Sequence, residues 1–120
     1  MAPRRGQIYF ANLRAGPARK RRPVLIVSRD ERNRWASDAL VVPVSSRIRH
    51  APTHVILDSG DGGLPQTSVA LCEQVTCLDK GVLDPQPLGA PVSAARMLAI
   101  ERCLLLSLGI EPHPDFPFAA

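Results

Sequence analysis

The sequence has no apolar run long enough to cross a bilayer, and no signal-peptide pattern at its start. We therefore expect no contact with a membrane. Cysteine is also scarce, because the chain has only Cys72, Cys77 and Cys103, all within apolar stretches. An odd number of cysteines argues against the disulfide framework of a small secreted domain. We expect buried thiols in a reducing cytoplasm.

The same residues give little support to a metal site. Cys72 and Cys77 are separated by four residues, which is not a usual spacing for zinc ligands, and no histidine lies close in sequence. The segment 58–63 contains two aspartates and three glycines, but it lacks the alternate ligands and terminal glutamate of a calcium loop. We expect a turn at 58–63, no metal and no cofactor.

The sequence is long enough for one domain, and its charge is distributed unevenly along the chain. Its 120 residues are 45% hydrophobic and 22% charged, as in globular domains. Residues 1–34 carry ten basic side chains against two acidic ones, a net charge of +8. Residues 35–120 carry five basic against nine acidic, a net charge of −4. The basic third is either solvated surface or a surface that meets an anionic partner.

Apolar patterning predicts short strands and one late helix. A basic mobile loop is expected at 14–21, and Pro43 suggests an edge or a bulge in its strand. Ser93 is a suitable N-cap for a helix over 94–108, which Gly109 would end. The expected strands are 6–13, 23–28, 39–44, 53–57 and 67–78. These elements favour a mainly β fold, a small and partly closed barrel capped by a helix.

A series of short motifs makes the sequence resemble one protein family over residues 5–110. The motifs, in order, are RGQIY at 5–9, RRPVLIVS at 21–28, NR at 33–34, LVVPVSS at 40–46, PTHV at 52–55, GLP at 63–65, SV at 68–69, EQV at 73–75, LDK at 78–80 and SLG at 107–109. Together they look like the MazF/PemK-type toxins, the ribonucleases of bacterial toxin–antitoxin modules. One such motif would be weak support, whereas the ordered set is specific.

The resemblance implies an SH3-like β-barrel of the CcdB/MazF type, with five to seven strands and a C-terminal helix. It implies a single domain at 1–110, a proline-rich and poorly ordered tail at 111–120, and a homodimer in the bacterial cytoplasm. The implied activity is metal-independent, sequence-specific cleavage of single-stranded RNA. The 2′-hydroxyl attacks the adjacent phosphate and leaves a 2′,3′-cyclic phosphate and a 5′-hydroxyl. A cognate antitoxin protein would block the RNA groove.

Two residues match the family's catalytic positions. Arg22, directly before Pro23, has a planar fork that can hold two phosphate oxygens as charge builds on them. A guanidinium does not readily lose a proton, so we expect transition-state stabilisation rather than base catalysis. The alternative for Arg22 is a surface contact to phosphate. Ser45 stands where the family usually has threonine, which keeps the hydroxyl and loses the methyl that restricts the rotamer. Its alternative is an ordinary strand-end serine.

Other side chains are candidates for RNA binding. Gln74 can both donate and accept, so it could read a base edge, or it and Glu73 could instead form hydrogen bonds inside the barrel. His54 is either structural or an acid–base group near neutral pH. The remaining candidates are polar or basic and lie either on the groove or in solvated loops: Arg14, Arg19, Lys20, Arg21, Ser46, Arg47 and Arg49, with His50 beside them.

Two other functions stay open at this stage. A toxin of the same fold can act by binding a protein target, as gyrase poisons do. Those relatives use a tryptophan near the end of the C-terminal helix, and the only tryptophan here is Trp35. A catalytically inactive, RNA-binding homologue is favoured if Ser45 does not replace the threonine. An RNA cleavage assay separates these alternatives.

Overall fold

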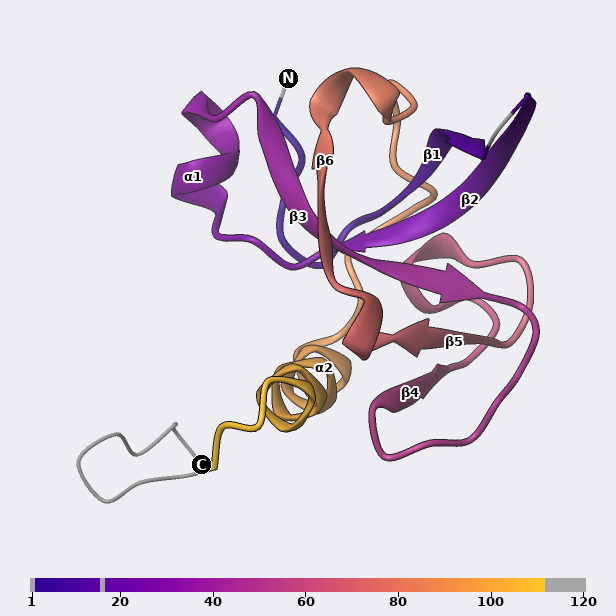
Figure 1. Ribbon diagram of the computed structural model, residues 1–120, viewed down its shortest axis with the longest axis vertical. Coiled ribbons are helices and arrows are strands. Elements are labelled where there is room, and N and C mark those ends of the chain that lie inside the picture. Colours follow the sequence, from indigo (N-terminus) through magenta and orange to yellow (C-terminus); the bar gives the residue numbers. More distant parts are fainter. Residues whose placement is uncertain (1, 16, 112–120) are drawn as a thin grey trace.

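A computed structural model describes residues 2–15 and 17–111 of the chain, so most of the expected tail lies outside the described residues. Six antiparallel strands form a bent sheet, and a C-terminal helix packs below it (Figure 1). In chain order the strands and α-helices are β1 (Ile8–Ala15), β2 (Ala18–Ile26), α1 (Asp30–Trp35), β3 (Asp38–Ser45), β4 (His54–Leu57), β5 (Ser68–Leu71), β6 (Thr76–Asp79) and α2 (Ala94–Ser107). Single turns of 3-10 helix are η1 (Asp61–Gly63), η2 (Cys72–Gln74) and η3 (Lys80–Val82).

The sheet runs in the order β1-β2-β3-β5-β4, and β6 pairs with the first half of β3. No pairing within the described residues joins β1 to β4, so the sheet does not close completely. The strand number and the C-terminal helix confirm the expected fold class. Pro43 does not mark an edge, because β3 is central. It lies where the second neighbour of β3 changes from β6 to β5, a place where a missing N–H breaks no regular ladder.

The sheet buries both of its faces around β2. Leu25 belongs to a cluster that contains Ile100 of α2, while Val24 and Ile26 belong to a second cluster with Val41. Successive side chains of a strand point to opposite faces, so this division shows that β2 is covered on both sides. The continuous apolar run at 23–28 correctly predicted a strand of this kind.

α2 begins at the residue expected from the sequence and ends at Ser107, one residue before the expected end. The Ser93 hydroxyl caps the helix by accepting from the backbone N–H of Arg96 at 3.2 Å, and Gly109 ends it in the left-handed conformation with φ of 73°. Met97 and Ile100 are buried. Leu108, directly after the last residue of α2, is 63% exposed, so apolar side chains continue beyond the core. Even α2, the longest helix of the described residues, is too short and polar to cross a membrane.

The basic segment 14–21 is not a loop, and this expectation was wrong. β1 and β2 form one long hairpin, paired from Ile8 with Leu25 up to Ala15 with Ala18. The arm projects from the body of the sheet (Figure 1), and residues 17–22 are all exposed. Basic side chains on an exposed two-stranded arm stay in water, so charge did not prevent strand pairing here.

The segment 67–78 is not one strand either. β5 ends at Leu71, η2 turns the chain, and β6 begins at Thr76 on a different part of β3. The break explains why the alternation of apolar side chains was not one-sided. It also affects the cysteines, because Cys72 is buried, Cys103 is half-buried and Cys77 is exposed. The prediction of three buried thiols was therefore wrong for Cys77.

Candidate active site

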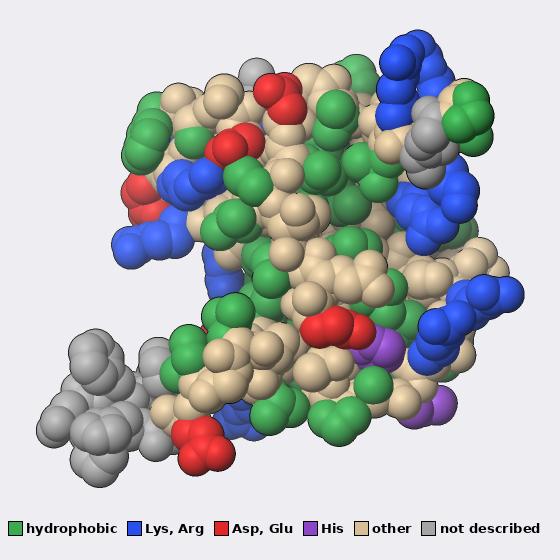
Figure 2. All heavy atoms as spheres, viewed as in Figure 1, with side chains coloured by type: hydrophobic (Ala, Val, Ile, Leu, Met, Phe, Trp, Pro, Cys, Tyr) green, Lys and Arg blue, Asp and Glu red, His purple; other side chains and the backbone are tan. Residues whose placement is uncertain are grey.

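A hollow with a volume of about 240 Å³ lies where the C-terminal end of β3 meets β2, β4, β5 and η2. Figure 2 shows Lys and Arg side chains gathered along this side of the molecule, over the β1–β2 hairpin and the connection from β3 to β4. The hollow contains six of the eleven residues singled out in the sequence. Its lining is Arg22, Ser45, Arg47, Arg49, His54, Leu71, Glu73 and Gln74.

The strand register explains why residues 23 positions apart share this hollow. β2 and β3 pair antiparallel, with Val24 opposite Pro43. Continuing that register by two residues places Arg22 opposite Ser45. Positions two apart on a strand lie on the same face, so both side chains leave the sheet on one side.

Arg22 carries a charge that no neighbour neutralises. Its side chain is exposed at the wall of the hollow, and no carboxylate within residues 2–15 and 17–111 forms an ion pair with it. An arginine in this state can give both arms of its guanidinium to the oxygens of a phosphate. The geometry fits the predicted role, which stays a prediction.

Ser45 is held in one orientation by the backbone of the turn that follows it. Its Oγ accepts a hydrogen bond from the backbone N–H of Arg47 at 3.1 Å. A hydroxyl that accepts in this way still has its own proton to donate. Ser45 can therefore offer an O–H to an oxygen bound in the hollow. Ser46 is exposed and is not part of the lining, so Ser45 is the better match to the catalytic threonine.

His54 and Glu73 form an ion pair at the bottom of the same hollow. Nε2 of His54 lies 2.7 Å from Oε1 of Glu73, and Nδ1 lies 2.9 Å from the carbonyl oxygen of Arg49. The hydrogen bond to the Arg49 carbonyl and the one to Glu73 raise the pKa of His54. Burial acts to raise the pKa of Glu73, but hydrogen bonds, first that with His54, outweigh it and lower the pKa. Each partner therefore favours the ionised form of the other.

The lining as a whole has the charge of an anion site. Its only carboxylate, Glu73, is paired with His54, which leaves three arginines for a ligand. Gln74 is exposed on η2 and forms no side-chain hydrogen bond within the described residues, so its amide can meet a base edge. Sequence reasoning missed Leu71, whose apolar side chain completes the wall. Its place at the end of β5 became visible only once the strand break at η2 was known.

The other five predicted residues lie outside this hollow. Arg14 and Arg19 face each other across the hairpin and line a second hollow of about 410 Å³ with Gly81 and Val82. Lys20 and Ser46 are exposed. Arg21 pairs with Asp84, and its guanidinium lies 4.6 Å from the centroid of the Phe10 ring, so its charge is already used.

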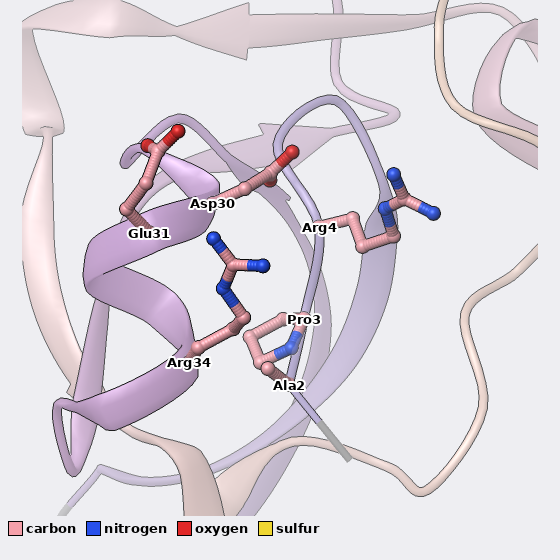
Figure 3. A pocket seen from close by; sticks show the side chains of 6 residues that line it. All are labelled: Ala2, Pro3, Arg4, Asp30, Glu31 and Arg34. Atoms are coloured by element: carbon pink, nitrogen blue, oxygen red, sulfur yellow. The ribbon is translucent and has the colours of Figure 1, made fainter.

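A larger hollow, of about 490 Å³, lies away from all of these residues. It is formed by the N-terminal segment and α1, and Figure 3 shows that Arg4, Asp30, Glu31 and Arg34 border it. Two carboxylates and two arginines border it, so the charges balance, and Asp30 already accepts a hydrogen bond from the backbone N–H of Arg5 at 2.7 Å. This hollow therefore has no preference for an anion. The described residues also contain no group of three metal-ligating side chains.

Comparison with known proteins agrees with this geometry. A family model described as PemK-like, MazF-like toxin of type II toxin–antitoxin system matches residues 4–108. Endoribonuclease EndoA of Bacillus subtilis (strain 168) is 36% identical over 85 residues, which cover 67% of this chain and 73% of the relative.

Solved structures show the same fold. An endoribonuclease in complex with its cognate antitoxin from a mycobacterial species has a TM-score of 0.78 and 34% identity, with 94% of this chain and 100% of that chain covered. The Mycobacterium tuberculosis toxin MazF-mt6 has a TM-score of 0.76 and 25% identity, with 88% of this chain and 98% of that chain covered. The chain belongs to the PemK-like, MazF-like toxins of type II toxin–antitoxin systems.

Proposed function

We propose that this protein is the toxin of a toxin–antitoxin module and cleaves single-stranded RNA in the hollow lined by Arg22 and Ser45. One observation carries the proposal: an unpaired guanidinium and a hydroxyl with a free proton meet in one hollow of excess positive charge. The printed names of the relatives, EndoA and the mycobacterial endoribonuclease, support the same activity.

In the proposed reaction the RNA itself supplies the nucleophile. The 2′-hydroxyl attacks the adjacent phosphorus, negative charge builds on the equatorial oxygens, and the 5′-oxygen leaves. Arg22 stabilises that charge with two N–H groups, and Ser45 donates a hydrogen bond to a phosphate oxygen or to the leaving oxygen. The products are a 2′,3′-cyclic phosphate and a 5′-hydroxyl, and no metal takes part.

The decisive experiment is cleavage of a long mixed-sequence RNA by the purified protein in EDTA. We expect cuts at a short motif, and Arg22→Ala should lower the rate by about 100-fold or more with the fold intact. Replacing the 2′-hydroxyl at a mapped cleavage site by hydrogen should make that site resistant. Unchanged cleavage by Arg22→Ala would remove the catalytic assignment, and cutting at the deoxy site would exclude the cyclic-phosphate route.

The proposed partners follow from the family to which the chain belongs. We expect a homodimer in the bacterial cytoplasm and a cognate antitoxin that covers the RNA groove, and the mycobacterial endoribonuclease is likewise found in complex with its cognate antitoxin. A protein that cleaves no RNA but binds it would support an inactive homologue. A protein that neither cleaves nor binds RNA would favour a toxin acting on a protein target.

A further inference from the structure

His54 borders the hollow but has no ring nitrogen free to face a ligand. Nδ1 is 2.9 Å from the carbonyl oxygen of Arg49, and Nε2 is 2.7 Å from Oε1 of Glu73. The side chain is only 9% exposed. An acid or base that acts on RNA must reach the reacting oxygen directly or through one water. In this arrangement the ring reaches two protein oxygens instead.

Both of these partners are hydrogen-bond acceptors. A backbone carbonyl has no proton to donate, and an ionised carboxylate has none either. A neutral imidazole has a single N–H, so it could satisfy one of the two oxygens and would turn a lone pair towards the other. Only the doubly protonated ring satisfies both. The geometry therefore selects the imidazolium.

The charges around His54 come from every element that packs against it. Glu73 of η2 is the one carboxylate in the lining and favours the proton, whereas Arg22 of β2 and Arg47 and Arg49 of the β3–β4 connection oppose it. From α2, the thiol of Cys103 lies 3.9 Å from the carbonyl oxygen of His54. The hydrogen bonds to the Arg49 carbonyl and to Glu73 outweigh burial and the charge of Arg49, so the pKa of His54 is raised.

The imidazolium joins two separate walls of the hollow. Glu73 belongs to η2, which also carries Gln74, and Arg49 belongs to the connection that carries Arg47. We propose that the doubly protonated His54 is a positioning residue of the RNA site, which ties η2 to the β3–β4 connection and neutralises Glu73 beside the bound phosphate. This inference rests on the proposed function.

Loss of the second proton of His54 should weaken RNA binding as the pH rises. A group whose pKa is raised by folding makes its full contribution at low pH and loses it as the pH rises through its pKa in the folded protein. When His54 becomes neutral, one of the two hydrogen bonds is lost and Glu73 presents an uncompensated negative charge to the phosphate. RNA should then bind less tightly, so KM rises more than kcat falls.

The test measures kcat and KM for a short RNA against pH in the wild type, Glu73→Gln and His54→Gln. We expect an alkaline rise in KM for the wild type, at a pH above the usual histidine pKa of about 6.5. In Glu73→Gln that rise should be much smaller, because no carboxylate faces the phosphate and the amide can donate to the neutral ring. In His54→Gln it should disappear. His50 is an exposed histidine of the β3–β4 connection and does not line the hollow, so His50→Gln is the control and should keep the wild-type profile. An alkaline rise that keeps its full size in Glu73→Gln overturns the proposal.

A second measurement does not depend on cleavage. Nitrogen-15 NMR of the histidine rings should show both nitrogens of His54 protonated at pH 6.5, with a pKa above the usual histidine value and lower in Glu73→Gln. A neutral His54 ring at that pH would overturn the proposal even in an active enzyme. If the ring titrates as expected but no RNA is cut at any pH, the proposed function fails instead, so the two failures are distinguishable.

Discussion

Ser45 shows how one side chain can keep its orientation without a β-methyl group. Threonine limits its own rotamers, whereas serine does not. Here the backbone N–H of Arg47 donates to Ser45 Oγ, which fixes the side chain from outside and leaves the hydroxyl proton free. The departure from the family's threonine therefore removes a methyl group without removing the hydrogen bond that the proposed reaction needs.

This arrangement predicts the behaviour of two substitutions at Ser45. Ser45→Thr should cleave RNA as fast as the wild type or faster, because the hydroxyl stays and the rotamer is restricted further. Ser45→Ala should lower kcat by about 100-fold, since a donor aimed at developing charge is lost. Single-turnover cleavage with saturating protein measures both. Ser46→Ala is the matched control and should be unaffected. A slow Ser45→Thr would argue that the two hydroxyls are not equivalent.

Asn33 is a residue whose role is stability alone. It is fully buried, and its Nδ2 donates to the carbonyl oxygen of Ser28 at 3.0 Å while Oδ1 accepts from the Ser28 hydroxyl. The same hydroxyl accepts from the backbone N–H of Leu40 at 3.0 Å. This buried network joins the end of β2, α1 and β3 on the side of the sheet away from the hairpin.

We predict that Asn33→Ala lowers the free energy of unfolding by about 2–4 kcal/mol, because the buried partners on Ser28 lose their hydrogen bonds. Urea denaturation measures the loss. The exposed neighbour Arg34→Ala should change stability by less than about 0.5 kcal/mol. Equal stability of the two variants would contradict this prediction, because it would mean that water replaces the hydrogen bonds that Ser28 loses. Activity below the unfolding transition should be unchanged in both.

At the scale of elements, the β1–β2 hairpin separates two kinds of basic residue. Arg22 lies at its base, in the hollow, whereas Arg14, Arg19 and Lys20 lie on the exposed arm. Charge on an exposed arm attracts the RNA backbone without reading its sequence, and each phosphate contact contributes to the salt dependence of binding. The arm and the hollow should therefore control different quantities.

The arm predicts a change in salt dependence when its charge is removed. In a variant with Arg14, Arg19 and Lys20 all changed to Ala, the slope of log affinity against log salt should fall by up to about 2, or about 0.7 per lost contact with a single strand. Fluorescence anisotropy with a labelled RNA at several salt concentrations measures this slope. Arg34→Ala on α1, across the sheet from the arm (Figure 1), should leave it unchanged. The cleavage motif should also stay the same.

Helices and strands were predicted correctly where the local sequence pattern agreed with the strand pairing of the folded sheet. The run at 23–28 and the helix capped by Ser93 were predicted correctly, because burial and capping leave marks in the sequence. The hairpin was missed because its strands are charged, and the break at η2 was missed because it depends on β3 changing partners. Arg22 and Ser45 could be named from their motifs. The hydrogen bond between His54 and Glu73 could not be predicted from the sequence, because the prediction requires knowing that β4 begins beside η2.

At the scale of the whole molecule, one side carries most of the large exposed apolar side chains, beside the charged groups of α1. α1 and the C-terminal end of α2 lie on the same side of the sheet (Figure 1), and Figure 2 shows that this side is concave. Large apolar side chains are exposed here and along β3: Trp35, Leu40, Leu106, Leu108 and Ile110. Exposed apolar groups that lie together often mark a surface that meets another protein. They lie opposite the basic arm, so a partner could cover them and leave the RNA side open.

The proposed homodimer can be tested with the protein's own fluorescence. Trp35 is the only tryptophan and is 79% exposed in the single chain. If a second copy covers this side, its emission should shift to shorter wavelength as concentration rises, in step with a doubling of the 13.0 kDa mass in sedimentation. Leu106→Glu should weaken both changes, because a charge would then be buried in the contact. Arg102→Glu, an exposed change on the same helix, is the control. A doubled mass without any change in Trp35 emission would place the dimer contact on another side of the molecule, and an unchanged mass would mean that the chain acts alone.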